Sequence, residues 1–374
     1  MMTKVSLEKH RELITFLNTV FGAGNPFDFE KLLPKLYLEK YDPCSTNEVI
    51  RVDGELVAAV GAFDAVMKVG DQTLNYTGIG NVAVSADARG KGHMIQCLNK
   101  VLQDKVDAGR DFAVLGGQRQ RYGYFGFDFF GVEYKATISR TNLRHVFGNQ
   151  PLQKLEIREL KEENTQYLDV IYELHSKRAL RTLRTREELF DILRSWEMVP
   201  KVILKDEVCI GYYTGEYQEL TLVSKEYIHD VIRTWLLTEE EIEIPIPMWN
   251  QELLDAVNEL YEYLDVSACE MINVFNYKRT LEAFLKLKIA REGLADGVEE
   301  FFIHGYTGDC RLKIVVKDNH VSVEESEGKE GIELTHKDAI EIFFGLNSTK
   351  RNRLKPAIRS WFPLPIYIEQ ADQV

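Results

Sequence analysis

The hydrophobic pattern of the first 148 residues changes from a helical period to a strand period and then back. Apolar residues spaced three and four apart predict two opening helices, over 7–21 and 29–37. Shorter apolar runs predict five strands, over 48–52, 56–67, 73–84, 112–115 and 132–139. The Asp53-Gly54 pair favours a hairpin between the first two strands, and a third helix ends near Ala108. This order predicts a mixed domain of helices and a strand meander.

The rest of the chain forms two further blocks with different patterns. Residues 151–270 repeat the order of the first block loosely, with alternating strand and helix patterns that include helices over 187–197 and 253–263. Residues 271–374 contain three strand patterns whose alternation is typical of an antiparallel sheet, over 298–303, 310–317 and 320–325. Thr335 is a candidate cap for a last helix. We therefore predict three domains, at residues 1–150, 151–270 and 271–374.

Composition places the chain among ordinary globular proteins and excludes several functions. Of its 374 residues 45% are hydrophobic and 28% are charged, and no apolar run is long enough to span a membrane. The first ten residues lack the apolar core of a signal peptide, and the five cysteines form no C-x-x-C pair. A cytoplasmic protein without disulfides or a zinc site is therefore expected, and no two histidines have metal-ligand spacing.

The formal net charge of −13 argues against nucleic acid as a partner, because contacts with phosphates need a basic face. The acidity is compatible with a cationic substrate. Most acidic proteins, however, carry such a charge only for solubility.

The stretch over 82–94 carries the clearest functional signal. An apolar strand enters a short turn with Gly90 and Gly92, and the turn opens a helix. The first N–H groups of a helix lack partners within it, so they can bind a phosphate, and glycines let the ligand approach the backbone. Arg89 and Lys91 add positive charge at the same place. The stretch therefore predicts a pyrophosphate-binding turn.

This turn resembles the acetyl-CoA motif of GNAT acetyltransferases, R/Q-x-x-G-x-G/A. Arg89 and Gly92 occupy its first and fourth positions, and Met94 stands where the family usually has Gly or Ala. A large residue there is found in the enhanced intracellular survival (Eis) type, which also has a Tyr-Gly-x-Phe-Gly segment like residues 122–126. The three-block layout agrees with that type, and residues 222–226 replace the glycine turn in the second block. The resemblance implies an α+β fold of two tandem GNAT-like domains, the second degenerate, followed by a domain similar to sterol carrier protein 2.

The resemblance implies roles for several residues around acetyl-CoA. Backbone groups of Val82, Ala83 and Val84 would pair with the pantetheine arm like an added strand. The pyrophosphate would be held by Arg89 and by the N–H groups of Gly90, Lys91, Gly92, His93, Met94 and Ile95. Gly117 and Gln118 follow the strand over 112–115, at a position that lies along the CoA arm in the family. His93 has a second interpretation, as a residue that faces solvent.

The resemblance also names an acid and a base for attack by an amine on the thioester. Tyr122 aligns with the tyrosine that protonates the departing thiolate in Eis-type enzymes. Judged only from the aromatic run around it, Tyr122 would be a core residue. In Eis-type enzymes the C-terminal carboxylate reaches into the active site, and here that group belongs to Val374.

The C-terminal tail over 360–374 is aromatic and apolar, whereas free tails are usually polar. We expect it to pack, either in the active site or on its own domain. Glu369 and Asp372 near its end are candidates for attracting a cationic substrate. Asp28 and Phe29, in the loop between the first two helices, are candidates for the acceptor pocket; the alternative is that they are solvated loop residues.

Together these features predict a cytoplasmic, acetyl-CoA-dependent N-acetyltransferase that uses no metal and works by direct attack in a ternary complex. The acceptor would be a primary amine, on a small cation such as an aminoglycoside or polyamine or on a lysine side chain. Eis-type relatives assemble into hexamers, so the resemblance implies a homo-oligomer. The alternative is a non-enzymatic CoA- or lipid-binding protein, which the sterol-carrier-like third block suggests.

Overall fold

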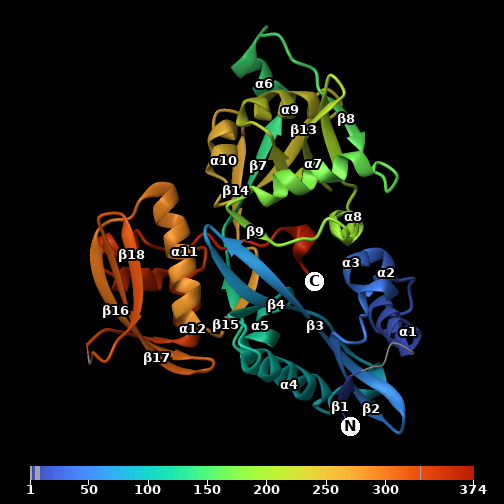
Figure 1. Ribbon diagram of the computed structural model, residues 1–374, viewed down its shortest axis with the longest axis vertical. Coiled ribbons are helices and arrows are strands. Elements are labelled where there is room, and N and C mark those ends of the chain that lie inside the picture. Colours follow the sequence, from blue (N-terminus) through green and yellow to red (C-terminus); the bar gives the residue numbers. More distant parts are fainter. Residues whose placement is uncertain (1, 5–8, 329) are drawn as a thin grey trace. The chain divides into compact units, whose positions relative to one another are not determined.

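The computed structural model describes residues 2–4, 9–328 and 330–374 (Figure 1). Contacts between residues gather the chain into two compact units. The first unit contains the chain up to Gly131 together with Glu270–Ile366 and Gln373–Val374. The second contains Val132–Cys269 and Tyr367–Asp372. The units are divided at other residues than the three sequence blocks, and the three-domain division stays a prediction.

The first unit is built on a mixed sheet with the strand order β1-β2-β3-β4-β5-β15-β6. These strands are β1 (Met2–Lys4), β2 (Asn47–Val52), β3 (Glu55–Val69), β4 (Gln72–Val84), β5 (Phe112–Leu115), β15 (Glu270–Val274) and β6 (Asp128–Phe130). The antiparallel meander of β2, β3 and β4 is confirmed. Asp53 and Gly54 make its first turn with φ angles of 51° and 89°. β5 then runs parallel to β4.

Helices cover both faces of this sheet. α1 (His10–Gly22), α2 (Phe29–Leu32) and α3 (Pro34–Tyr37) lie on one face, and α4 (His93–Asp107) lies on the other (Figure 1). Because side chains alternate along β3, Val60 joins the cluster under α4 while Phe63 meets the ring of Tyr37.

The prediction of a single helix over 29–37 is wrong. Pro34 has no backbone donor and begins a separate short helix after Leu33. The helix predicted over 7–21 begins at His10 in the structure, and residues 7–8 lie outside the described part of the chain.

The sequence pattern does not predict β15. This strand enters between β5 and β6, with Met271 opposite Leu115 and Ile272 opposite Asp128. The predicted block boundary at residue 270 falls where β15 begins, so residues beyond that boundary complete the sheet of the first block. The helix predicted over 253–263 also ends early, because α10 (Gln251–Val257) stops and a new strand, β14 (Tyr263–Ser267), follows.

The antiparallel strands predicted for the third block are confirmed. β16 (Gly297–Gly305), β17 (Gly308–Lys317) and β18 (His320–Glu325) are antiparallel, and β19 (Ile332–Thr335) pairs parallel with β16. α11 (Tyr277–Glu292) precedes this sheet, and α12 (His336–Phe343) and α13 (Pro356–Arg359) follow it. The Thr335 hydroxyl caps α12 by accepting from Asp338 N at 3.2 Å. The tail packs as expected, because Trp361, Leu364 and Ile366 are buried.

The second unit contains two smaller sheets, with the orders β12-β11-β10-β8 and β13-β7-β14. Their strands are β8 (Glu156–Glu159), β10 (Lys201–Lys205), β11 (Val208–Thr214), β12 (Gln218–Leu222), β13 (Glu241–Pro247), β7 (Glu133–Ser139) and β14. The strand predicted over 132–139 is thus present, but it pairs with β13 and β14 of the second block. In each unit, therefore, one sheet contains a strand from a different sequence block, β15 in the first unit and β7 in the second.

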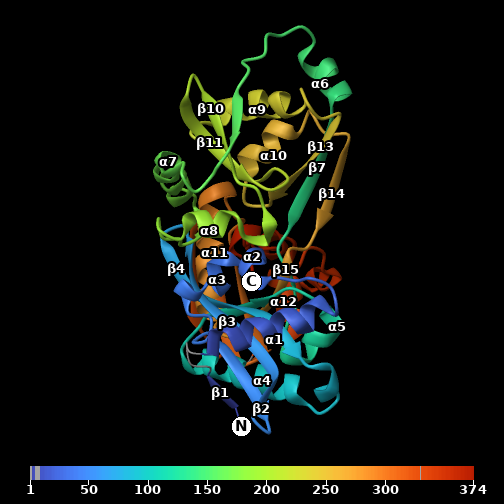
Figure 2. The ribbon, with the colours of Figure 1, turned by 90° about the vertical axis from the view of Figure 1, so that its right-hand side faces the viewer.

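Helices also lie on both faces of the β10–β11 pair. α7 (Thr165–Ser176) covers one face, and α9 (Ile228–Trp235) with α10 covers the other (Figure 2). α6 (Arg140–Phe147) and the short strand β9 (Leu180–Thr182) also belong to this unit. The helix predicted over 187–197 shortens to α8 (Leu189–Leu193), since a 3-10 turn with Trp196 at a φ of 61° follows it. Among the described residues, no helix combines the length and apolar character needed to span a bilayer.

Candidate functional site

The glycine turn leads from β4 into α4, as the sequence predicts. Gly90 and Gly92 have φ angles of 76° and 79°, the left-handed region that favours glycine. Gly92 is the N-cap of α4, and none of the described side chains caps the helix. Gln96 N is the first to bond back, to Gly92 O at 3.0 Å, so the N–H groups of residues 93–95 have no acceptor in the helix. A Cβ on either glycine would meet no atom within 4 Å among the described residues beyond the chain neighbours, so the turn leaves open space of the kind in which a phosphate can approach a helix N-terminus.

β4 continues past its pairing with β5. The paired residues end at Gly78 and Val114, whereas β4 runs on to Val84. A register shift against β3 lies just before this free stretch, where Asn81 has a φ of 38°. The Asn81 side chain is fixed by the Tyr37 hydroxyl, which donates to it at 2.6 Å. The backbone of Val82, Ala83 and Val84 therefore lies beyond the β5 pairing, where an extended ligand can pair with it.

The C-terminus is seated on β4 just before that stretch. A Cβ on Gly78 would lie 2.6 Å from Val374 Cγ2, and a Cβ on Gly80 would lie 3.4 Å from the carboxylate carbon of Val374. Because glycine has no side chain, Gly78 and Gly80 leave the space that Val374 occupies. Lys35 Nζ donates to the Gln373 carbonyl at 2.7 Å and anchors the same end of the chain.

Glu270 is a second carboxyl group in this region that sequence reasoning missed. Its Oε1 lies 3.5 Å from the place that a Cβ of Gly116 would take, at the end of β5. Its Oε2 is buried and has no hydrogen-bond partner within the described part of the chain. Burial raises the pKa of Glu270 to about 7, against the opposing charge of Lys35. Only the pairing of β15 brings Glu270 here, and the sequence gives no signal for that pairing.

Tyr122 ends the short helix α5 (Arg119–Tyr122) and is buried on the face of the sheet that α4 covers. Its ring lies under Gly117, where a Cβ would be 2.9 Å from Tyr122 Cε2. Burial raises the pKa of the Tyr122 hydroxyl and Arg121 partly lowers it, so the hydroxyl keeps its proton at neutral pH. Val374 lies against the opposite face of β4: it contacts Gly78 and Gly80, whereas Ile79 between them joins the cluster that contains Tyr122.

The segment that carries Tyr122 is fixed by side chains from beyond residue 270. Asn273 Nδ2 donates to the Phe125 carbonyl at 2.8 Å. His336 Nδ1 accepts from Tyr306 N at 3.2 Å, so its Nε2 carries the proton and donates to the Gly126 carbonyl at 3.0 Å. Burial lowers the pKa of His336 to about 4, which keeps this bridge neutral.

Asp28 and Phe29 have structural roles that the sequence does not reveal. The Asp28 carboxylate caps α2 by accepting from Glu30 N at 3.0 Å. Phe29 is only 3% exposed, so it is not a solvated loop residue. Its ring centroid lies 4.7 Å from that of Tyr37, which in turn lies 5.7 Å from that of Phe63, beside Gly80. A row of rings thus leads from Phe29 toward the seat of Val374, and the role of both residues in an acceptor pocket stays a prediction.

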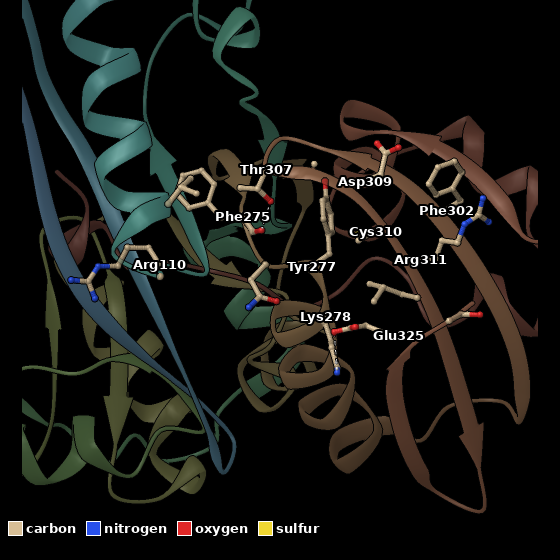
Figure 3. A pocket seen from close by; sticks show the side chains of 16 residues that line it. Arg110, Phe275, Tyr277, Lys278, Phe302, Thr307, Asp309, Cys310, Arg311 and Glu325 are labelled. Atoms are coloured by element: carbon tan, nitrogen blue, oxygen red, sulfur yellow. Dashed lines mark hydrogen bonds and ion pairs between the residues drawn. The ribbon is translucent and has the colours of Figure 1, made fainter. Parts of the chain in front are cut away.

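A cavity of about 710 Å³ lies between the end of α4 and the third block (Figure 3). Charged side chains of both signs line it, including Arg110, Asp309 and the Lys278–Glu325 pair at 3.6 Å. Arg311 stacks on Phe302 at 3.9 Å from the ring centroid. This lining does not suit an acyl chain, so it does not favour the lipid-binding alternative. No group of His, Cys, Asp and Glu arranged for a metal ion occurs in the described residues.

Comparisons with known proteins agree with this geometry. Residues 2–130 match the family model of the acetyltransferase (GNAT) domain. No curated protein matches the chain. Similar solved structures include a GCN5-related N-acetyltransferase from Anabaena variabilis (16% identity, TM-score 0.70), Eis1 from Mycobacterium abscessus (14%, 0.69), and a probable N-acyltransferase of unknown function from Enterococcus faecalis (12%, 0.66).

The first two similarities cover all of both chains, and the third covers 93% of this chain and 90% of the other. At these identities the likeness concerns the fold, a mixed α/β fold with several sheets that extends over the whole chain. The family model, in contrast, matches the sequence itself over the segment that contains the glycine turn. Residues 2–130 of this protein are therefore a GNAT acetyltransferase domain.

Proposed function

We propose that this protein is an acetyl-CoA-dependent N-acetyltransferase whose acceptor is a primary amine. One observation carries the proposal: β4 seats the carboxylate of Val374 at Gly78 and Gly80 and then leads into the open glycine turn. A group that can take a proton and a site that can hold a pyrophosphate thus lie along one strand and its following turn.

In this proposal the pyrophosphate binds the N–H groups of residues 90–95, with Arg89 and Lys91 balancing its charge. Pantetheine pairs with the backbone of residues 82–84, and Gly117 and Gln118 flank the same arm. The uncharged form of the amine attacks the thioester carbon, and the proton that its nitrogen loses on becoming an amide passes to the Val374 carboxylate. The C–S bond breaks, and the thiolate takes the proton of Tyr122. No covalent enzyme intermediate forms.

The acceptor in this proposal is a cation, either a small polyamine-like or aminoglycoside-like molecule or a lysine side chain. The Val374 carboxylate attracts such a cation, and Glu270 adds a second negative charge once it loses its proton above about pH 7. Asp28 and Phe29 lie on the approach to the same strand. We further propose that the second unit is a degenerate GNAT-like domain, supported by its similar strand order. Likeness of the third block to sterol carrier protein 2, a cytoplasmic location and a homo-oligomer belong to the same proposal.

The test incubates the purified protein with acetyl-CoA and a panel of polyamines, aminoglycosides and lysine peptides, and measures the CoA thiol released. We expect release with at least one amine. A variant with Gly-Ser-Gly added after Val374 should lose about 10²-fold of the rate, as expected for loss of a general base. The same three residues added before Met1 serve as the control. No release with any amine would favour the CoA-binding alternative, and an unchanged rate in the extended variant would remove Val374 from the mechanism.

A further inference from the structure

A cluster of buried charged side chains in the second unit encloses the last turn of the chain, and we call it the tail clamp. Arg184 makes two hydrogen bonds to Glu219, at 2.7 and 2.9 Å, and two to Asp372, at 2.8 and 2.9 Å. Arg178 pairs with Glu369 and also with Glu219, at 3.2 Å for the second pair. The side chains of Arg184 and Glu219 are 0% and 1% exposed.

The clamp corrects the expectation that Glu369 and Asp372 attract a cationic substrate, because arginines of this chain already neutralise them. Burying several charges is costly even when they are paired, and apolar side chains often stabilise a core equally well. Directed, two-pronged bonds between guanidinium and carboxylate groups instead fix one geometry. The feature that these bonds fix here is the path of residues 369–372.

The clamp acts close to the end of the chain. Gln373 and Val374 follow Asp372 directly, and two residues span at most about 7 Å even when fully extended. Anchoring Asp372 therefore limits the region that the carboxylate of Val374 can reach. The hydrogen bond from Lys35 to the Gln373 carbonyl and the contacts of Val374 with Gly78 and Gly80 then define its seat on β4.

We propose that Arg184 and Arg178 are positioning residues that hold the C-terminal carboxylate in place for catalysis, acting through Asp372 and Glu369. This inference rests on the proposed role of Val374 as the base. Chain ends are ordinarily mobile, whereas a base must stay within hydrogen-bond reach of the proton it takes. A group misplaced by only 1 Å can lose about 10²-fold in rate, so a base at a chain terminus needs such an anchor.

The test replaces Asp372 with alanine. In Asp372→Ala, Arg184 keeps its bonds to Glu219, so no buried charge is left alone and the unit keeps its core. Gln370→Ala is the matched control, because Gln370 lies in the same short turn (Gln370–Asp372) and is not a member of the clamp. Two quantities are measured: the rate at which a carboxypeptidase releases Val374, and kcat and KM for acetyl transfer.

We expect Asp372→Ala to release Val374 about tenfold faster than the wild type, because the tail opens more often. Its kcat should fall about 10²-fold with the KM for acetyl-CoA nearly unchanged. Gln370→Ala should leave both quantities at wild-type values. In the protein extended by Gly-Ser-Gly, Asp372→Ala should cause no further loss of rate, since both changes act through the same carboxylate.

Two results would overturn the clamp: unchanged release of Val374 from Asp372→Ala, or faster release with an unchanged kcat. A wild-type protein without transfer activity would instead refute the proposed function. In that case the rates at which a carboxypeptidase releases Val374 from the wild type and from Asp372→Ala would by themselves show whether the clamp holds the tail.

Discussion

The turns after β4 and after β12 each join a strand to a helix, one in each unit. They differ in the partners of the N–H groups at the start of the helix. After β4, Gly92 begins α4 without a side-chain cap. After β12, the Ser224 hydroxyl accepts from Glu226 N at 3.3 Å, and a 3-10 turn (Lys225–Tyr227) leads into α9. The second turn satisfies the N–H of Glu226 from within the chain, whereas the N–H groups of residues 93–95 have no acceptor in their helix. Unsatisfied N–H groups therefore distinguish the turn that we propose binds a pyrophosphate from the turn that only connects a strand to a helix.

Two carboxyl groups, Glu219 in the second unit and the half-buried Glu270 in the first, show the same contrast. Burial alone would raise the pKa of Glu219, but Arg184, His175 and Arg178 lower it well below its ordinary value. For Glu270 only the charge of Lys35 opposes the effect of burial, and its Oε2 has no hydrogen-bond partner within the described residues. Glu219 is thus a structural anion, while Glu270 is a carboxyl group that remains available at the proposed site.

We expect the largest effect from placing an acceptor side chain in the first turn, where the second turn has Ser224. In Gly92→Asp, a carboxylate stands where the pyrophosphate would bind, and aspartate tolerates the left-handed backbone better than most residues. Like charges placed together cost several kcal/mol, so CoA affinity should fall about 10³-fold. Ser224→Asp makes the matched change at the second turn and should leave affinity unchanged. Titration calorimetry with CoA measures both, and wild-type affinity in Gly92→Asp would refute the proposed phosphate site.

A smaller loss is expected from removing the proposed acid. Tyr122→Phe keeps the buried ring but removes the hydroxyl whose raised pKa holds its proton, so kcat should fall about 10²-fold. The KM for acetyl-CoA should change little, because the hydroxyl acts in the transition state. Tyr124→Phe is the control, as Tyr124 is 90% exposed on the same segment. Steady-state kinetics with thiol detection would exclude Tyr122 as the acid if both variants match the wild type.

Features that depend on neighbouring residues could be predicted from the sequence, and features that depend on distant pairing could not. The Asp53-Gly54 hairpin, the glycine turn and the cap at Thr335 are local, and the structure contains all three. β15 is five residues long and joins β5 from more than 150 positions away. Glu270 and the bonds between Arg184 and Asp372 depend on such long-range packing, so no local pattern reveals them.

The contrast between the two carboxyl groups predicts opposite responses to pH. Glu270 keeps its proton in the folded protein up to about pH 7, whereas its ordinary pKa is 4.5. The folded state binds more protons across that range, so this group's contribution to stability falls as the pH rises from 4.5 through 7. Between pH 5 and pH 8 the wild type should lose about 2 kcal/mol of unfolding free energy from this group, a figure reduced because the side chain is only half-buried. Glu270→Gln should not show this loss.

Urea unfolding at the two pH values measures this difference, with Glu243→Gln on the second unit's surface as the control. Equal pH dependence in Glu270→Gln and the wild type would contradict a raised pKa. Glu219 has the opposite sign: its lowered pKa contributes stability above its ordinary value of 4.5, and that stability is lost as the pH falls.

The smallest effect concerns the second turn. Ser224→Ala removes the hydroxyl that accepts from Glu226 N and should cost about 1 kcal/mol of unfolding free energy, the usual cost of losing a helix cap. Affinity for CoA should not change, because the proposal assigns no ligand to this turn. Urea unfolding and calorimetry measure the two quantities, and Ser224→Thr should restore the lost stability by restoring the hydroxyl. A loss of CoA affinity in Ser224→Ala without a loss of stability would mean that the second turn also binds the ligand, and the distinction between the two turns would then be wrong.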